Sequence, residues 1–253
     1  MRVFALSDVH VDHDVNAKWV ADLSAAEYRD DVLILAGDVT DRLSLLGWCL
    51  SALAARFRKV LFVPGNHDLW VIRDRQDGDS LQKLDAVREV VESSGASMGS
   101  FRTPGLSIIP LLAWYDGSFG EPSEELRSMW MDYRACRWPP GMDEKHVSSL
   151  LAAENDTAAD GHASTVITYS HFVPRIDVLP TFIPAAYRFL DPILGTTRLE
   201  HQLRELTPKI HVYGHSHFNR RVQIDGVIYV NNALGYPNES RIAARRLVSI
   251  HEF

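Results

Sequence analysis

The chain has 253 residues, of which 46% are hydrophobic and 23% are charged, values typical of a globular protein and not of a disordered or low-complexity one. Its formal net charge is −7 at pH 7, which argues against a general nucleic-acid-binding surface, because such proteins present a basic face. A phosphorylated substrate is still compatible with this charge, since bound cations can make a single site locally positive.

Features tied to cellular location are few. The two cysteines, Cys49 and Cys136, form no CxxC motif, and so small a number fits a reducing compartment. The apolar stretch at the N-terminus ends before Asp8, too early for a secretory signal. No run of 18 apolar residues suggests a membrane span. We therefore expect a cytoplasmic protein with no membrane segment, and the sequence leaves its oligomeric state open.

Five short apolar runs predict strands that are buried on both faces, because they are rich in Val and Ile and too short for helices. These runs cover residues 3–6, 32–36, 60–63, 166–169 and 210–213. Between the first three runs, amphipathic patterns predict helices over residues 17–29 and 43–58. The spacing of about 30 residues is that of a βαβ unit.

Further elements follow downstream. A third helix is predicted over residues 81–94, because Asp79 is a suitable cap and Gly95 a suitable stop. An Asp-Gly turn predicts a hairpin over residues 222–230, and a last strand is expected over residues 247–250.

No repeat or linker divides the chain, so we expect a single domain over residues 1–253. Residues 116–163 differ from the rest in their Trp, Tyr and Pro content and in their weak helical patterns. We predict that they form an insertion or cap within that domain.

Each of the five buried runs ends in polar residues. In an open α/β sheet, ligands bind outside the carboxyl ends of the strands, so these side chains are expected to share one site. The set consists of Asp8, His10, Asp38, Asn66, His171, His215 and His217. It offers oxygen and imidazole donors and no thiolate, which suits Mn, Fe, Zn or Ni. Seven ligands exceed one tetrahedral ion and fit two ions that share a bridging carboxylate.

Each motif has a plainer interpretation on its own. An Asp-x-His or Gly-Asp after a strand is a common turn, and a lone histidine is most often a surface or hydrogen-bonded residue. The shared-site hypothesis rests on the conjunction, because five independent strand ends rarely all deliver metal ligands by accident.

The five clusters together resemble the ordered motifs of the calcineurin-like metallophosphoesterase superfamily. Those motifs are D-x-H, G-D-x-x-D, G-N-H-[DE], a lone His and G-H-x-H. Here they read Asp8-Val9-His10, Gly37-Asp38-Val39-Thr40-Asp41, Gly65-Asn66-His67-Asp68, Ser170-His171 and Gly214-His215-Ser216-His217. The resemblance covers residues 8–217 and implies a four-layer α/β/β/α sandwich, with two central sheets flanked by helices.

The resemblance also implies roles for individual residues. Asp8, His10 and His217 would hold one ion, and Asn66, His171 and His215 would hold the other, with Asp38 as the bridge. His67 would stabilise the phosphate or protonate the leaving oxygen, and Asp41 would orient it. For Asp68, the alternative to a role in the site is a bracing role in its own Gly-Asn-His turn.

Two departures from the protein Ser/Thr phosphatases of this superfamily place the chain with its broad bacterial-type branch. The sequence has Leu43 where those enzymes have Gly after Asp-Arg, and Asp68 where they have Glu. These differences argue against a phosphoprotein substrate and against phosphate binding by Arg42.

We expect a metal-dependent hydrolase of phosphate esters that uses two divalent or mixed-valence ions, manganese among them, and a bridging hydroxide. The first hypothesis is a phosphomonoesterase acting on a phosphorylated small molecule. The alternatives are a phosphodiesterase, acting on a cyclic nucleotide or other diester, and a non-catalytic metal-binding scaffold.

Several other residues remain open. His13 is interpreted as an exposed loop histidine in preference to an eighth ligand. Arg175 could meet a phosphate oxygen or be a solvated charge. Asn231 and Asn232 could approach the site or form a turn. Five aromatic residues could wall a substrate pocket or form a local core, and these are Trp130, Tyr133, Trp138, Phe182 and Tyr187.

Overall fold

Three of the predicted strands lie side by side in parallel as β1 (Arg2–Leu6), β2 (Val32–Ala36) and β3 (Lys59–Val63). Strand β10 (Val248–Glu252) pairs with β1 in antiparallel orientation and completes a four-stranded sheet. This arrangement is seen in a computed structural model, which describes residues 1–74, 78–155, 157 and 163–252. Every residue of β2 is buried, as its continuous apolar run predicts.

A second sheet of six strands has the order β4-β5-β6-β7-β9-β8. Its parallel strands are β5 (Leu106–Pro110), β6 (Thr165–Tyr169), β7 (Ile210–Tyr213) and β9 (Val227–Asn231). The antiparallel edges are β4 (Phe101–Thr103) and β8 (Arg220–Ile224). Strands β8 and β9 are the predicted hairpin, with Asp225 and Gly226 at positive φ in its turn.

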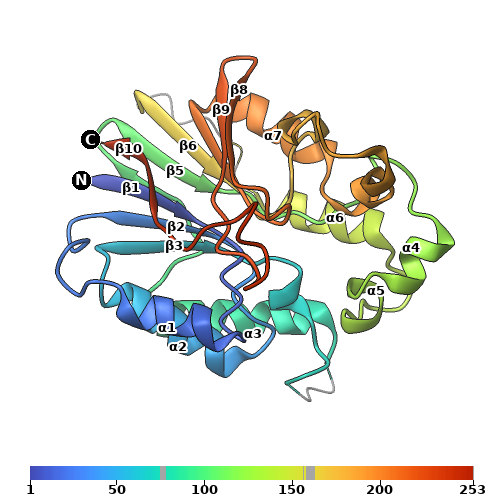
Figure 1. Cartoon of the computed structure of the whole chain (residues 1–253), viewed down its shortest axis with the longest axis horizontal. Coiled ribbons are helices and arrows are strands. Elements are labelled where there is room, and N and C mark those ends of the chain that lie inside the picture. The colour runs from blue at the N-terminus through green and yellow to red at the C-terminus, as the bar shows by residue number, and fades with distance from the viewer. Residues whose placement is uncertain (75–77, 156, 158–162, 253) are drawn as a thin grey trace.

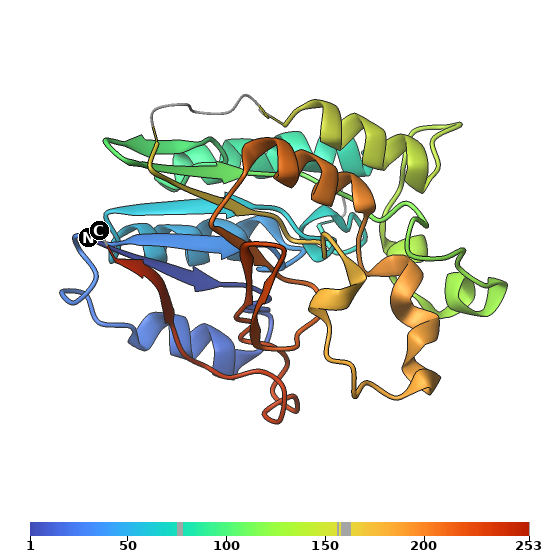
Figure 2. The same cartoon turned by 90° about the horizontal axis from the view of Figure 1, so that it is seen from above.

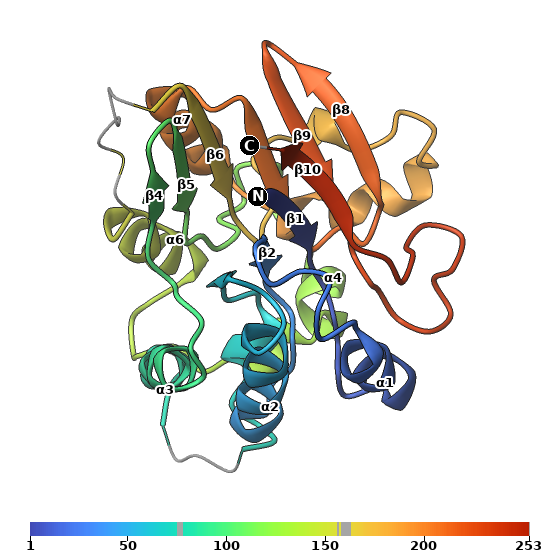
Figure 3. The same cartoon turned by 90° about the vertical axis from the view of Figure 1, so that its left-hand side faces the viewer.

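The two sheets pack face to face through one buried apolar cluster, to which β2 contributes Ile34 and β6 contributes Ile167. A second cluster lies on the outer face of the four-stranded sheet, where α1 (Asp14–Asp22), α2 (Leu43–Ala54) and α3 (Ser80–Ser93) pack. A third covers the outer face of the other sheet with α6 (Glu144–Ala153) and α7 (Thr197–Leu206). Helices therefore flank the paired sheets on both sides, which is the expected four-layer arrangement (Figures 1 and 3).

Short helices gather beyond the carboxyl ends of the strands, opposite the chain termini (Figures 1 and 2). They include α4 (Glu124–Met129) and α5 (Asp132–Ala135), which belong to the stretch 116–163. Residues 156 and 158–162 of that stretch lie outside the described residues. The described residues also form the 3-10 helices η1 (His67–Leu69), η2 (Ile176–Val178) and η3 (Ala185–Ile193).

The observed bounds of α1 differ from the predicted ones. Helix α1 begins at Asp14 and ends at Asp22, whereas we expected residues 17–29. Its terminal carbonyls are taken by Arg56, whose guanidinium donates to Ala21 O at 2.7 Å and to Leu23 O at 2.9 Å. The expected cap of α3 is confirmed, because Asp79 accepts hydrogen bonds from two backbone amides of its first turn.

No helix among the described residues is both long enough and apolar enough to cross a bilayer.

Lys83 on α3 provides a test of a buried polar link in this fold. Its side chain is 1% exposed, pairs with Asp74 and donates to the Asp41 carbonyl at 2.7 Å. We expect Lys83→Met to lower the free energy of unfolding by about 3 kcal/mol, because Asp74 loses the cation that pairs with it and the Asp41 carbonyl loses its donor.

Urea denaturation at pH 7 measures this change. Lys18→Met is the matched control, since the Lys18–Asp22 pair is 75% and 61% exposed and its loss should cost less than about 1 kcal/mol. Equal effects of the two substitutions would contradict the role given to Lys83.

Candidate metal centre

The loops that follow β1, β2, β3, β6 and β7 bring all seven predicted ligands into one place. One group, with donor atoms within 4.8 Å of one another, consists of Asp8, His10, Asp38 and His217. A second consists of Asp38, His171 and His215. Asn66 joins the second group, because its Oδ1 lies 3.1 Å from His171 Nε2. Asp38 is thus the residue common to both groups, as expected of a bridging carboxylate.

The imidazoles are aimed as metal ligands would be. His171 Nε2 lies 3.2 Å from His215 Nδ1, close to the separation of about 3.3 Å expected for two ligands at metal–nitrogen distances of 2.0–2.1 Å in a tetrahedral site. The opposite nitrogens face backbone carbonyls, with His171 Nδ1 2.9 Å from Ala36 O and His215 Nε2 3.0 Å from Ile193 O. A neutral imidazole that donates to a carbonyl has its lone pair on the other nitrogen, so two lone pairs face each other here. This arrangement fits a cation between them.

The charges of the site point the same way. Burial lowers the pKa of His10, His171 and His215, which leaves these rings neutral and able to bind a metal at pH 7. Burial also lowers the pKa of His217, but the carboxylates of Asp8 and Glu239 outweigh it and raise that pKa to about 10. A cation that binds His217 must therefore displace a proton from it.

Several buried carboxyl groups lie close together at the site. Burial, followed by the neighbouring charges of Asp68 and Asp8, raises the pKa of Asp38 well above its usual value. All three residues are at most 1% exposed. Burying like charges together is costly unless cations neutralise them, so this donor set fits a pair of metal ions.

The backbone around the ligands adopts conformations that most residues avoid. Five of the predicted ligands have left-handed φ values between 44° and 63°, and these are Asp8, His10, Asp38, His215 and His217. Such strain in non-glycine residues is concentrated at functional sites. Gly65 is needed for a different reason, because a Cβ there would lie 2.2 Å from Asp38 Oδ1.

Asp68 fastens the loops that carry two of the ligands. Its carboxylate accepts hydrogen bonds from the backbone N–H groups of Asp38, Val39, Thr40 and Gly65 at 2.8–3.1 Å. Asp68 therefore braces its own turn and also holds the loop after β2 in place.

His67 lies beside the two groups, with its Nε2 3.8 Å from Asp38 Oδ2. Its ring stacks on Trp70 at a centroid distance of 3.7 Å, and the Tyr236 hydroxyl lies 3.4 Å from Nε2. Burial, together with His171 and His217, lowers the pKa of His67 to about 3. The ring is therefore neutral at pH 7 in this structure.

The expected pairing of Asp41 with His67 is wrong. Asp41 is buried, and its carboxylate accepts a hydrogen bond of 2.6 Å from Arg73 Nε. Arg73 also pairs with Asp12 at 2.9 Å. The His67 ring is directed toward Trp70 and Tyr236, so among the described residues no hydrogen bond joins it to Asp41.

Sequence reasoning missed several residues that surround the ligands. Asp132 accepts hydrogen bonds from Asn66 Nδ2 at 2.8 Å and from the indoles of Trp70 and Trp130. Glu239 Oε2 lies 2.6 Å from His217 Nδ1, and Tyr236 stacks on His10 at 4.4 Å. Of these residues, only Asp132 could have been noticed in the sequence, because it lies between Trp130 and Tyr133, which the sequence analysis had already singled out. Nothing in the sequence near Glu239 indicates a ligand-binding motif.

The open residues now have places. Arg175 is held by Asp177, Glu200 and Asp225 and makes no contact with the predicted ligands among the described residues. His13 makes an edge contact with Tyr236.

The side chains of Asn231 and Asn232 donate hydrogen bonds to backbone carbonyls, and these bonds tie strand ends together. Trp130, Tyr133 and Trp138 pack into the core under α6, whereas Phe182 and Tyr187 line a cavity.

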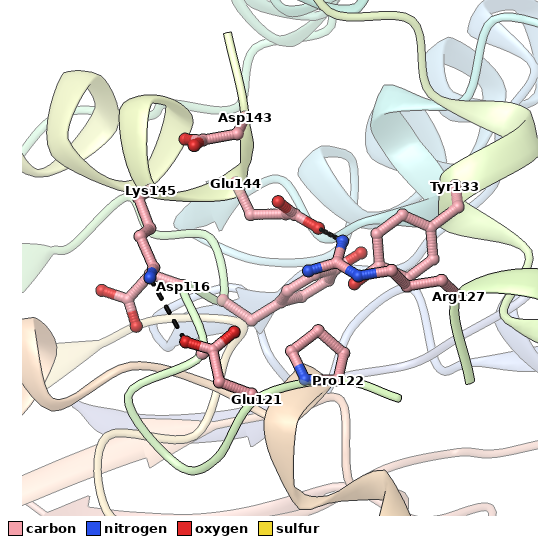
Figure 4. A pocket seen from close by; sticks show the side chains of 10 residues that line it. Asp116, Glu121, Pro122, Arg127, Tyr133, Asp143, Glu144 and Lys145 are labelled. Atoms are coloured by element: carbon pink, nitrogen blue, oxygen red, sulfur yellow. Dashed lines mark hydrogen bonds and ion pairs between the residues drawn. The ribbon is translucent and has the colours of Figure 1, made fainter. Parts of the chain in front are cut away.

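A small polar cavity of about 100 Å³ lies between α4 and α6 (Figure 4). The ion pairs Arg127–Glu144 and Lys145–Glu121 cross it. All of its lining residues except Tyr115 belong to residues 116–163, so we assign it to the packing of that stretch.

Asp132 provides a test of how Asn66 is held. We expect Asp132→Ala to weaken Mn²⁺ binding by about 10–100-fold, because the carboxylate that fixes the Asn66 amide is lost. Isothermal titration of the apoprotein with Mn²⁺ measures the affinity. Asp143→Ala is the control, since Asp143 caps α6 in the same stretch and touches no predicted ligand. Unchanged Mn²⁺ affinity in a folded Asp132→Ala protein would contradict this role.

Comparison with known proteins agrees with this geometry. A curated relative, the [acyl-carrier-protein] phosphodiesterase PptH of Mycobacterium tuberculosis, is 28% identical over 262 residues, which cover 94% of this chain and 79% of that protein. The crystal structure of phosphopantetheinyl hydrolase (PptH) from the same organism matches with a TM-score of 0.81 and 25% identity, covering 100% of this chain and 96% of that one. The family model for calcineurin-like phosphoesterases matches residues 1–219. The chain therefore belongs to the calcineurin-like phosphoesterase family, whose members are hydrolases of phosphoester bonds.

Proposed function

We propose that this protein is a metal-dependent phosphodiesterase that releases a phosphopantetheinyl group from a carrier protein. The observation that carries the proposal is the pair of ligand groups sharing Asp38, which suits in-line attack on a phosphoester between two ions. The likeness to PptH over nearly the whole chain favours a diester on a protein over the phosphorylated small molecule and monoester first expected.

The charge of the surroundings also favours a diester. A monoester is a dianion at neutral pH, and enzymes often neutralise its extra charge with arginine. Arg73 and Arg175, which lie close in sequence to the site motifs, are both held by carboxylates. A diester monoanion demands less cationic help, and the ions alone would supply it.

The two ions would be held by residues of distinct loops. Asp8, His10 and His217 would bind one, and Asn66, His171 and His215 the other, with Asp38 between them. The oxygen and imidazole donors suit Mn, Fe, Zn or Ni. When bound, two such ions supply a nucleophile from water at neutral pH and neutralise the phosphate oxygens.

Protonation of the departing oxygen would fall to the protein's own residues. The stack of His67 on Trp70 fixes the ring beside Asp38, where its Nε2 can meet the departing oxygen. A neutral imidazole can donate a hydrogen bond there, and a nearby phosphate charge would raise its pKa toward protonation. Asp41, engaged with Arg73, is given no part in this proton transfer.

The main test uses holo-acyl carrier protein as substrate. We expect Mn²⁺-loaded enzyme to convert it to the apo form, measured as loss of the prosthetic group by intact-protein mass spectrometry. Chelation should abolish turnover, and Asp38→Asn should abolish it as well, because the shared ligand is lost. Among small esters, bis(4-nitrophenyl) phosphate should be hydrolysed faster than 4-nitrophenyl phosphate. A faster monoester reaction with intact holo-carrier would refute the proposal.

The role of His67 is tested by varying the leaving group. We expect His67→Ala to lower turnover by about 10²–10⁴-fold for diesters of alcohols with high pKa, and much less for nitrophenyl diesters, whose leaving group needs no proton. Metal content should be unchanged, because Asn66 and not His67 is the proposed ligand.

A second variant separates two roles of His67. Gln can donate a hydrogen bond but cannot become a cationic acid, so His67→Gln should rescue turnover only if the imidazole acts by hydrogen bonding. Equal losses for all leaving groups in both variants would mean that His67 donates no proton.

A further inference from the structure

An apolar cavity near the ligand groups lies between the segment around η3 and the loop that carries His215 and His217. Its volume is about 560 Å³, within the range of sites that bind small organic groups. The apolar part of its lining includes Phe182, Tyr187, Leu190 and Phe218. Phe182 and Tyr187 are 73% and 59% exposed, so their rings are accessible to a ligand in the cavity.

The inner wall of this cavity is formed by residues that adjoin the predicted ligands His215 and His217. Ser216 lies between His215 and His217 in the chain, and Glu239 contacts His217 Nδ1 at 2.6 Å. Leu194, also in the lining, follows Ile193, whose carbonyl faces His215. The cavity therefore lies directly beside the loop that holds His215 and His217, within reach of an organic group joined to a phosphate at the metal centre.

The charge and polarity of the lining residues indicate which part of a substrate the cavity can bind. Glu239 and Asp191 are the lining residues that carry negative charge, and they would repel a phosphate. The aromatic and aliphatic side chains favour an uncharged carbon chain.

We propose that this cavity binds the apolar part of the organic group esterified to the phosphate, which in the proposed function is the pantetheine arm. In that arm the first apolar group, a dimethyl-substituted carbon, is two bonds from the ester oxygen. In this proposal the methyl groups contact Phe218, which follows His217 in the chain and whose ring meets that of Phe182 edge to face at 5.6 Å. This inference rests on the proposed phosphodiesterase function.

A homologous series of 4-nitrophenyl alkyl phosphates, from methyl to octyl, tests the cavity directly with Mn²⁺-loaded enzyme. The nitrophenolate is the same in each diester, so differences report on binding of the alkyl chain. We expect kcat/KM to rise by up to about fourfold for each methylene that is buried. A flat series in the wild-type protein would overturn the proposal without any variant.

Substitutions then locate the effect. In Phe182→Ala/Tyr187→Ala, the ratio of kcat/KM for the octyl ester to that for the methyl ester should fall by at least tenfold. The matched control is Phe189→Ala, an exposed aromatic residue of the same segment that does not line the cavity, and it should keep the wild-type ratio. A ratio unchanged by the double substitution would place the chain-binding surface elsewhere and overturn the assignment.

Holo-acyl carrier protein separates this inference from the proposed function. If the carrier is untouched but the alkyl series keeps its slope and the double variant loses it, the carrier function fails and the cavity assignment stands. If the carrier is hydrolysed equally well by wild type and double variant, the function stands and the assignment fails. If the variant loses activity on the carrier alone, the aromatic residues bind the carrier's surface and the assignment also fails.

Discussion

The site depends most on the carboxylate of Asp68, which binds backbone N–H groups and is not one of the predicted metal ligands. It accepts four backbone N–H groups, three from the loop after β2 and one from the loop after β3. Hydrogen bonds to a charged acceptor are strong, and here they pull the two loops together so that Asp38 and Asn66 face the same space. Since Asp68 is fully buried, losing even one of these bonds would leave an orphaned charge or donor in the interior.

The convergence of ligands from two sheets needs a second set of contacts. At the site end, Ser7 N donates to Asn232 O, and Ser7 forms an isolated parallel bridge with Ala233. Gly214 N donates to His171 O, and a Cβ on Gly214 would lie 2.7 Å from Ala36 O. The strand ends of both sheets are therefore locked together by backbone contacts. Side chains on opposite sheets can consequently hold fixed positions relative to one another.

The sequence predicts the parts of this arrangement that follow from local rules. Buried Val and Ile runs predict β1, β2, β3, β6 and β7, and polar residues at their ends predict a common site because parallel strands end on the same edge. The partner of Asp41 could not be predicted, since nothing local distinguishes Arg73 from other arginines. Glu239 and Asp132 were missed for the same reason, because they meet His217 and Asn66 only through the tertiary fold.

Backbone strain and charge act together at this site. Five of the predicted ligand residues are held in left-handed conformations, and each such residue costs about 1–3 kcal/mol. Asp8 and Asp38 are buried beside one another and add repulsion. The strain and the repulsion both oppose folding, so burial of the core between the two sheets must offset them. Bound cations would reduce the repulsion, and they would bind ligands that are already in place. Ligands positioned before the metal arrives lose little entropy on binding, and a hydrolase benefits because the geometry for attack on phosphorus is then set by the fold.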